Sequence, residues 1–384
     1  MPNDPGRRQF VAAATALAGL AMLPRALAGA GVGTGAADAT VRWPRYRDAI
    51  VVDSCGAPGR DTGDLHALDA AELADLRASG VTAINFTVGA VGSYANDFER
   101  TMANIAHWDA QIAAHPDVLV KLTRGADIGA AKRSGRLGIL YGFQDTTMYG
   151  ENLDRFDAFH DFGVRIVQLT YNRRNLMGDG CLEPGDAGLS RLGVEMVARM
   201  NERGTLLDLS HCGDRTTREG IAASKKPVAI THTGCRALAD MPRNKPDAIL
   251  RAMADRGGVA GIYVMPYLRA SGQVVAADVI AHVEHALKVC GEDHVGIGTD
   301  GTVSAVHLTP EFRRRFADEI ADRRKRGISA PGERADSFTF APDLNEPRRM
   351  ERIASLLSKR GHSDARIEKV LGGNFARLFA DVIV

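Results

Sequence analysis

The feature that most constrains the fold is a regular alternation of short apolar runs with amphipathic stretches, which begins near residue 48. In the amphipathic stretches, apolar residues recur at spacings of three and four, which is typical of helices that bury one face. We predict eight strands, at residues 49–53, 81–88, 137–143, 164–170, 205–210, 228–231, 258–264 and 294–299. The helices predicted between them include residues 70–78, 153–162, 193–203, 216–224, 247–255 and 277–289.

Eight strand–helix units in succession predict an α/β fold of the (β/α)8 TIM-barrel type. An open, doubly wound sheet is the alternative, but no glycine-rich phosphate loop follows the first strand. Residues 310–327 are rich in charge and are predicted to form a solvated helix inserted after the eighth strand, and residues 345–379 supply closing helices. We therefore expect residues 38–384 to form a single barrel domain.

The first 37 residues have the pattern of an export leader. Arg7 and Arg8 precede an apolar run at residues 11–23, and Ala26 and Ala28 provide a small-residue cleavage site. This pattern predicts a twin-arginine signal peptide and a periplasmic protein. The apolar run is shorter than the roughly 20 residues that span a bilayer, so no membrane span is expected in the mature protein.

Charge and cysteine content restrict the partners. The chain has 48 basic and 47 acidic residues, a net charge of +1, which argues against nucleic-acid binding and favours a small-molecule substrate. Its 5 cysteines are too few for a disulfide scaffold, although one disulfide among the last four is an open alternative. The oligomeric state is also open, with a homodimer as one alternative.

Polar residues gather where the predicted strands end, which is where a barrel of this type carries its chemistry. His211 and His232 follow consecutive strands, so their imidazoles can point into one cavity and share a divalent metal ion. Asp300 follows the last strand, and its carboxylate could accept a proton from an attacking water molecule. A histidine that merely caps a strand end is the alternative for either imidazole taken alone.

Several motifs, in order along the chain, resemble those of the membrane (renal) dipeptidase family. They are Leu-Leu-Asp-Leu-Ser-His at 206–211, Pro-Val-Ala-Ile-Thr-His-Thr at 227–233, Pro-Arg-Asn-Lys-Pro-Asp at 242–247, Asp-His-Val-Gly-Ile-Gly-Thr-Asp-Gly at 293–301 and Gly-Gly-Asn-Phe-Ala-Arg-Leu-Phe at 372–379. The resemblance implies a zinc dipeptidase on a (β/α)8 barrel, with two metal ions bridged by a glutamate.

The resemblance also implies roles for individual residues. His211 and His232 match the two histidines of the second metal, and Asp300 matches the acidic residue that handles the proton of the attacking water. Arg243 matches the arginine that holds the terminal carboxylate of the substrate, and Asn244 belongs to the same substrate-binding motif. The planar fork of arginine suits a carboxylate because it can donate two parallel charged hydrogen bonds.

Other positions depart from the family pattern. Cys55 and Ala57 replace the histidine and aspartate that follow the first strand, Gln144 replaces the bridging glutamate, and Tyr171 replaces a histidine that stabilises the oxyanion. A neutral amide offers no charge to offset the repulsion between two dications. We therefore expect at most one zinc ion, held by His211 and His232 with Cys55 as candidate third ligand and Gln144 nearby.

Three hypotheses follow. The first is a metal-dependent hydrolase of dipeptides or dipeptide-like amides with a mononuclear site, and we place it ahead because Asp300, Arg243 and both histidines are retained. The second is a binding protein that has lost hydrolysis. The third is an enzyme that processes a modified peptide or a secondary metabolite, in which Tyr171 or Cys55 acts as acid, base or nucleophile. The loops after the second, third and seventh strands are expected to set the side-chain preference.

Overall fold

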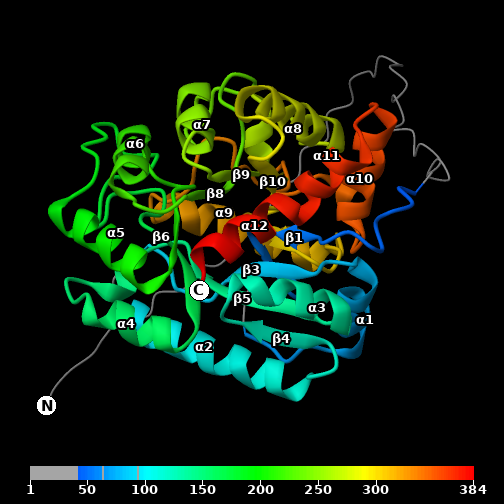
Figure 1. Cartoon of the computed structure of the whole chain (residues 1–384), viewed down its shortest axis with the longest axis horizontal. Coiled ribbons are helices and arrows are strands. Elements are labelled where there is room, and N and C mark those ends of the chain that lie inside the picture. The colour runs from blue at the N-terminus through cyan, green and yellow to red at the C-terminus, as the bar shows by residue number, and fades with distance from the viewer. Residues whose placement is uncertain (1–41, 63–64, 93–94) are drawn as a thin grey trace, which may run out of the picture. The chain divides into compact units, whose positions relative to one another are not determined.

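The computed structural model describes residues 42–62, 65–92 and 95–384 (Figure 1). The predicted signal peptide lies outside these ranges. Among the described residues, no helix combines the length and the apolar character that are needed to cross a bilayer. All five cysteines lie in the described part of the chain, and each is a free thiol there.

The core of the fold is a parallel barrel, as the alternating pattern predicts. Neighbouring strands of the barrel pair in parallel. Their order around the barrel is β1 (Val52–Asp53), β3 (Ala83–Thr87), β5 (Leu137–Phe143), β6 (Val164–Gln168), β7 (Leu206–Asp208), β8 (Ala229–Thr233), β9 (Val259–Ile262) and β10 (Val295–Ile297). The Ser54 backbone N–H donates to the Ile297 carbonyl at 3.0 Å, which links the two ends of the sheet. The (β/α)8 prediction is confirmed.

Three strands were not predicted. β4 (Leu119–Leu122) pairs with the first half of β5, while β6 pairs with its second half. Since β3 occupies the other edge of β5, β4 and β6 share one edge, and the register shifts between Tyr141 and Gly142. β2 (Gly56–Ala57) and β11 (Gly301–Thr302) form a two-stranded ladder just past the ends of β1 and β10. This ladder extends the contact between the first and last strands of the barrel.

Helices surround the barrel, and the six that periodicity predicted are present with ends shifted by two residues or fewer. They are α1 (Ala70–Ser79), α4 (Asp154–Asp161), α5 (Arg191–Arg203), α6 (Asp214–Ala223), α7 (Asp247–Ala254) and α8 (Ala276–Cys290). Two helices between β3 and β5 were not predicted, α2 (Asp97–Ala114) and α3 (Ile128–Ser134). The C-terminal helices are α10 (Arg349–Lys359), α11 (Asp364–Glu368) and α12 (Asn374–Val382).

Helix α12 closes one end of the barrel. Its apolar face, with Phe375, Leu378 and Phe379, packs in one buried cluster with residues that begin strands, among them Val52 and Leu206. The helix therefore covers the amino ends of the strands and leaves their carboxyl ends for the chemistry (Figure 1).

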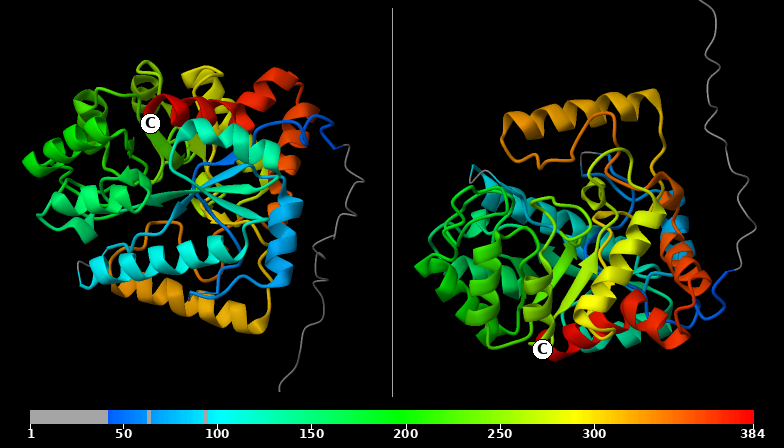
Figure 2. Two further views of the ribbon diagram at one scale, coloured as in Figure 1. Left: turned by 60° about the horizontal axis from the view of Figure 1, so that its bottom comes forward. Right: turned by 90° about the horizontal axis from the view of Figure 1, so that it is seen from above.

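Helix α9 (Pro310–Lys325) follows β11, at the place where the sequence predicts an inserted helix. The expectation that it is a solvated helix is wrong for one of its faces, because Phe316 and Ile320 are only 5% and 2% exposed. Its three consecutive arginines gave the segment a solvated composition, whereas its apolar residues recur every four positions. Figure 2 shows α9 as an orange helix set over one side of the barrel.

Candidate functional site

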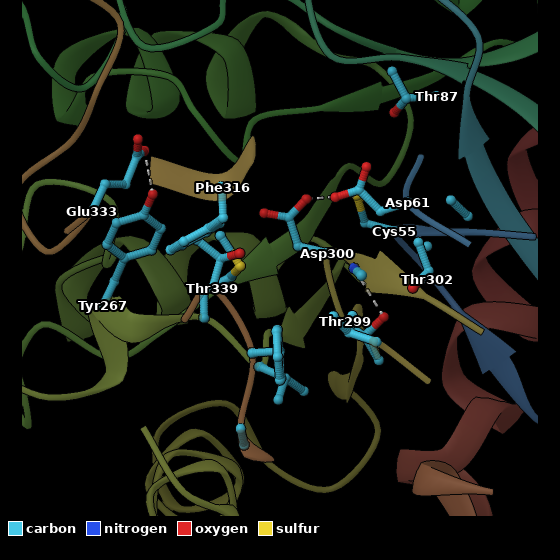
Figure 3. Close-up of a pocket in the computed structure, with 18 of the residues that line it drawn as sticks. Cys55, Asp61, Thr87, Tyr267, Thr299, Asp300, Thr302, Phe316, Glu333 and Thr339 are labelled. Carbon is cyan, nitrogen blue, oxygen red and sulfur yellow. Dashed lines mark hydrogen bonds between the residues drawn. The ribbon is translucent and has the colours of Figure 1, made fainter. Parts of the chain in front are cut away.

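A cavity of about 360 Å³ opens at the carboxyl ends of the strands. Residues that follow five barrel strands line it, namely Cys55, Gln144, Tyr171, His211 and Asp300. Residues 264–267, which follow β9, add Val264, Met265 and Tyr267 to its wall. Figure 3 shows Cys55, Asp300 and Tyr267 facing this space. The sequence also led us to expect the functional residues at the carboxyl ends of the strands.

Three potential metal ligands gather beside the cavity. Cys55, His232 and Asp300 each offer one ligand atom, and these atoms all lie within 4.8 Å of one another. The Cys55 thiol donates to Asp300 Oδ1 at 3.7 Å. Cys55 and His232 are buried, whereas Asp300 is half-buried at the cavity wall. The set therefore mixes sulfur, nitrogen and oxygen, all of which zinc accepts.

The imidazoles of His211 and His232 also meet, with their Nε2 atoms 2.8 Å apart. The Asn172 amide nitrogen donates to Ile328, so its Oδ1 is an acceptor and His211 Nδ1, at 2.6 Å, is the donor. Thr231 donates its hydroxyl proton to Asp208, so it accepts from His232 Nδ1 at 2.8 Å. Each neutral ring then carries its proton on Nδ1, and two Nε2 lone pairs face one another, as in a pair of ligands to one cation.

Two buried carboxylates position these groups. Asp208 accepts from the Ser210 and Thr231 hydroxyls, both at 2.6 Å, and Thr231 in turn holds His232. Asp53 accepts from the backbone N–H and the hydroxyl of Thr299 at 2.8 and 2.6 Å, next to Asp300. Both residues appeared in the sequence only as polar strand ends. Their contacts show that they fix the ends of β7, β8 and β10.

Asp300 has an unusual backbone. Its φ of 55° lies in the left-handed region, which non-glycine residues rarely adopt, although aspartate tolerates it better than most. The Asp300 N–H donates to the Cys55 carbonyl at 2.7 Å and holds this conformation. Burial raises the pKa of the Asp300 carboxyl, while the positive charges of Arg243 and Arg323 oppose that rise. A carboxylate with a raised pKa is better suited to accept a proton than an ordinary aspartate.

Gln144 and Tyr171 both reach the cavity. The Gln144 amide nitrogen donates to the Cys55 sulfur at 3.4 Å and to the Thr87 hydroxyl at 3.0 Å. The Tyr171 ring stacks on His211, with centroids 4.2 Å apart, and its hydroxyl accepts from Arg323 at 3.1 Å. Burial raises the pKa of Tyr171, which keeps the phenol protonated and able to donate.

Arg243 is a buried cation, 1% exposed, that lies outside the residues lining the cavity. It donates to the Ser210 carbonyl at 2.9 Å, whereas its Nε and Nη2 atoms find no partner among the described residues. Its guanidinium carbon lies 5.9 Å from the ring centre of Tyr267, which does line the cavity. A buried guanidinium with two unused donor atoms is a strong binding site for an anion, which would accept both hydrogen bonds.

The side-chain amide of Asn244, in contrast, already forms hydrogen bonds within the protein through both its nitrogen and its oxygen. Its amide nitrogen donates to the carbonyls of Ala239 and Tyr267 at 2.7 and 2.8 Å, and its oxygen accepts from the Tyr263 hydroxyl. The structure thus places Asn244 inside the loop that carries Arg243, away from the cavity lining.

Arg323 and Glu333 also belong to the site, although they are part of none of the sequence motifs. Arg323, on α9, donates to both carboxylate oxygens of Glu333 at 2.7 and 2.8 Å, and Glu333 also accepts from the Tyr267 hydroxyl at 2.6 Å (Figure 3). Burial would raise the pKa of Glu333, but Arg323 overrides this and the pKa is lowered. The pair therefore stays charged and fixes the position of Arg323 beside Tyr171. The spacing of Phe312, Phe316, Ile320 and Arg323 along one helix face is the sequence signal that could have pointed to it.

Comparison with known proteins agrees with this architecture. A family model described as membrane dipeptidase, peptidase family M19, matches residues 48–311. Dipeptidase verJ of Clonostachys rogersoniana is 31% identical over 234 residues, which are 60% of this chain and 60% of that protein. Dipeptidase ataJ of Aspergillus terreus is 26% identical over 290 residues, 68% of this chain and 70% of that protein. The chain thus spans 60% of the length of verJ.

Solved structures share the fold. An amidohydrolase from Pseudomonas aeruginosa is 33% identical, with a TM-score of 0.74 that covers 88% of this chain and 97% of that one. A metallo peptidase from Rhodobacter sphaeroides, liganded with a phosphinate mimic of L-Ala-D-Ala, is 18% identical, with a TM-score of 0.70 over 87% of this chain and 100% of that one. Since the family model matches residues 48–311, the chain belongs to the membrane dipeptidase family, peptidase family M19.

Proposed function

We propose that this protein is a metal-dependent hydrolase of dipeptides or dipeptide-like amides that works with a single zinc ion. The observation that carries the proposal is the convergence of the His211 and His232 Nε2 atoms, 2.8 Å apart, with both Nδ1 protons committed elsewhere. This arrangement presents two nitrogen lone pairs to one cation.

The donor set fits zinc. Bond lengths of about 2.0 to 2.3 Å in a tetrahedral site place ligand atoms about 3 to 4 Å apart. The ligand atoms of Cys55, His232 and Asp300 lie within 4.8 Å of one another, so small movements bring them to that spacing. Cys55 and His232 belong to that group and would hold the ion, with Asp300 beside them, and His211, whose Nε2 lies 2.8 Å from that of His232, would complete the ligands. A bound zinc ion supplies Lewis-acid polarisation of the amide carbonyl.

The remaining steps fall to side chains of the protein. The Asp300 carboxylate accepts the proton of the attacking water, because it lies at the cavity wall and burial raises its pKa. Tyr171 donates a hydrogen bond to the oxygen of the reacting carbonyl. Arg323 already donates to the Tyr171 hydroxyl oxygen, so the phenolic proton is free for this bond. Preorganised donors of this kind stabilise charge that develops in the transition state.

Arg243 is the proposed binding site for the terminal carboxylate of the substrate. Its two unused donors can form the bidentate pair that a carboxylate prefers, and the pairing would neutralise a buried charge. The residue that the resemblance assigned to this task is therefore also the one whose hydrogen-bonding capacity is incomplete in the protein alone.

Zinc titration of the apoprotein by calorimetry tests the proposal. We expect the wild type to bind one equivalent of zinc tightly and His232→Ala to bind none. His285→Ala removes a histidine of α8 that pairs with Asp247, and it should bind one equivalent as the wild type does. Hydrolysis of a dipeptide panel should rise in step with zinc occupancy. Dipeptide hydrolysis that persists in full in the presence of a chelator would contradict the proposal. Zinc-independent binding of dipeptides without turnover would instead identify a binding protein.

We also propose that the protein reaches the periplasm by the twin-arginine route. Arg7, Arg8 and the apolar run that follows them support this location. Replacing both arginines with lysine should leave the protein in the cytoplasmic fraction, and an unchanged periplasmic fraction would argue against the route.

A further inference from the structure

One side of the cavity is built from aromatic side chains that belong to residues 310–345. Phe312 and Phe316 on α9, and Phe340 after it, line the space, and we call these three residues the aromatic wall. Phe312 stacks on Phe316 with ring centres 5.9 Å apart, and Phe338, behind the wall, lies 5.2 Å from Phe340. Figure 3 shows Phe316 and Thr339 on the side of the cavity opposite Thr87.

The aromatic wall lies beyond the part of the chain that carries the family chemistry. The family model ends at residue 311, and α9 begins at Pro310. The candidate ligands and Arg243 all precede that boundary. The proposed metal ligands, Asp300, Tyr171 and Arg243 thus come from other segments than the aromatic wall, so the wall can set the choice of substrate through residues that carry no reacting group.

The rest of the cavity lining contains both polar and apolar side chains. Cys55, Asp300 and Tyr171 are polar lining residues, whereas Met265, Ile320 and Leu344 add apolar side chains to those of the aromatic wall. In a cavity of about 360 Å³, this apolar surface adds binding free energy only if the part of the substrate that contacts it is also apolar.

The aromatic wall is held in place before any substrate arrives. The Arg323–Glu333 pair ties α9 to the segment that follows it. The Gln273 amide nitrogen donates to the carbonyls of Phe338 and Phe340 at 3.2 and 2.8 Å, and its oxygen accepts from the Phe338 N–H at 2.8 Å. Because these contacts already fix the backbone of this segment, substrate binding should cost little further conformational entropy there.

We infer that the aromatic wall binds an aromatic side chain of the substrate, so that the preferred substrates are dipeptides, or dipeptide-like amides, with one aromatic residue. The inference rests on the proposed function and specifies its substrate class. Aromatic rings pair favourably at centroid separations of about 4.5 to 7 Å in stacked or edge-to-face geometry, and the rings of the wall and of Phe338 already meet in this way. A substrate ring would extend the same cluster into the cavity.

The test compares kcat/KM of the zinc-loaded enzyme for Ala-Phe, Phe-Ala and Ala-Ala. We expect at least about a 30-fold preference for one of the phenylalanine dipeptides over Ala-Ala, in line with the discrimination that apolar pockets achieve. Phe340→Ala, at a half-buried position, should reduce that preference to about threefold or less by lowering kcat/KM for the preferred phenylalanine dipeptide. Phe316→Leu, a milder change at a buried position, should lower it by an intermediate amount.

Phe162→Ala provides the matched control, because it removes the same side chain from a 43% exposed position outside the cavity lining. Equal kcat/KM of the wild type for all three dipeptides, or an unchanged preference in Phe340→Ala, would overturn the inference. Calorimetric binding of the same dipeptides separates the two claims. Tighter binding of an aromatic dipeptide that is lost in Phe340→Ala, but without turnover, would uphold the aromatic site and refute the proposed hydrolysis.

Discussion

His282 on α8 is a buried histidine whose burial should make the stability of the protein depend on pH. The side chain is 1% exposed. Its Nδ1 accepts from the Cys235 backbone N–H at 2.9 Å, so Nε2 carries the proton and donates to the Leu268 carbonyl at 3.0 Å. The neutral imidazole thus ties α8 to two loops, one of which leads to Arg243.

Burial lowers the pKa of His282 from 6.5 to about 4. The sign of the effect follows from proton binding. Between these two pH values the unfolded chain binds a proton at His282 and the folded protein does not, so the free energy of unfolding falls as the pH falls. At about 1.4 kcal/mol for each pKa unit, the full contribution is about 3 kcal/mol. Between pH 7.5 and pH 5, about 2 kcal/mol of it should be lost.

The perturbation is His282→Gln, which keeps a donor for the Leu268 carbonyl but cannot be protonated. Urea unfolding followed by tryptophan fluorescence gives the free energy of unfolding at each pH. In the variant, the unpaired Cys235 N–H lowers the free energy of unfolding by the same amount at every pH. The comparison therefore uses the change in this free energy with pH and not its absolute value. We expect the wild type to lose about 2 kcal/mol more than the variant between pH 7.5 and pH 5.

Other groups titrate in the same range, which is why a difference between two proteins is needed. Burial raises the pKa values of Asp53 and Asp145 to about 6. As the pH rises from the ordinary pKa of each carboxyl to its raised pKa, the free energy of unfolding falls. This trend is opposite in sign to that of His282. These contributions cancel when the wild type is compared with His282→Gln. The half-buried His285 provides the control as His285→Gln. Parallel pH profiles for the wild type and His282→Gln would refute the reasoning.

Three further predictions concern the site. Arg243→Lys should lower kcat/KM for free dipeptides by at least about tenfold, because a point charge replaces a bidentate fork, and amidation of the substrate's C-terminus should cause a similar loss in the wild type; equal turnover of free and amidated substrates would count against the assignment. Tyr171→Phe should lower kcat by about 10- to 100-fold with little change in KM, measured by steady-state kinetics, and a change confined to KM would assign the phenol to binding. Restoring the family pattern with Cys55→His, Ala57→Asp and Gln144→Glu should raise the zinc stoichiometry from one to two in a titration, whereas two tight equivalents in the wild type would disprove the mononuclear site.

Periodicity predicted the barrel because its strands consist largely of buried β-branched and other apolar residues. It missed β4, whose four residues include the lysine of Leu-Val-Lys-Leu and form only half of a shared edge. It also missed β2 and β11, which have two residues each and exist only because the ends of β1 and β10 come together. Such pairings depend on tertiary contacts and leave no local pattern in the sequence.

The positions of the candidate ligands at strand ends followed from the sequence, but their detailed grouping did not. The Nδ1 protons of His211 and His232 are committed by Asn172 and Thr231, and no spacing in the sequence specifies those partners. The loops expected to set substrate preference supply part of the cavity, yet Phe312 and Phe316 of the aromatic wall come from the segment that composition marked as solvated. A helix with many arginines can still bury one face, and only its four-residue spacing shows this.

The bond between the Cys55 thiol and Asp300 joins two residues 245 positions apart, at the first and last strands of the barrel. The Asp53 carboxylate, which binds the Thr299 N–H and hydroxyl, spans the same seam. The complete reactive centre therefore does not exist in any partly formed barrel, since Asp300, the proposed proton acceptor, arrives only with the final strand. The proposed hydrolysis, which needs Asp300, would thus report that the last strand has joined the first, and a chain that ends before residue 300 would lack it.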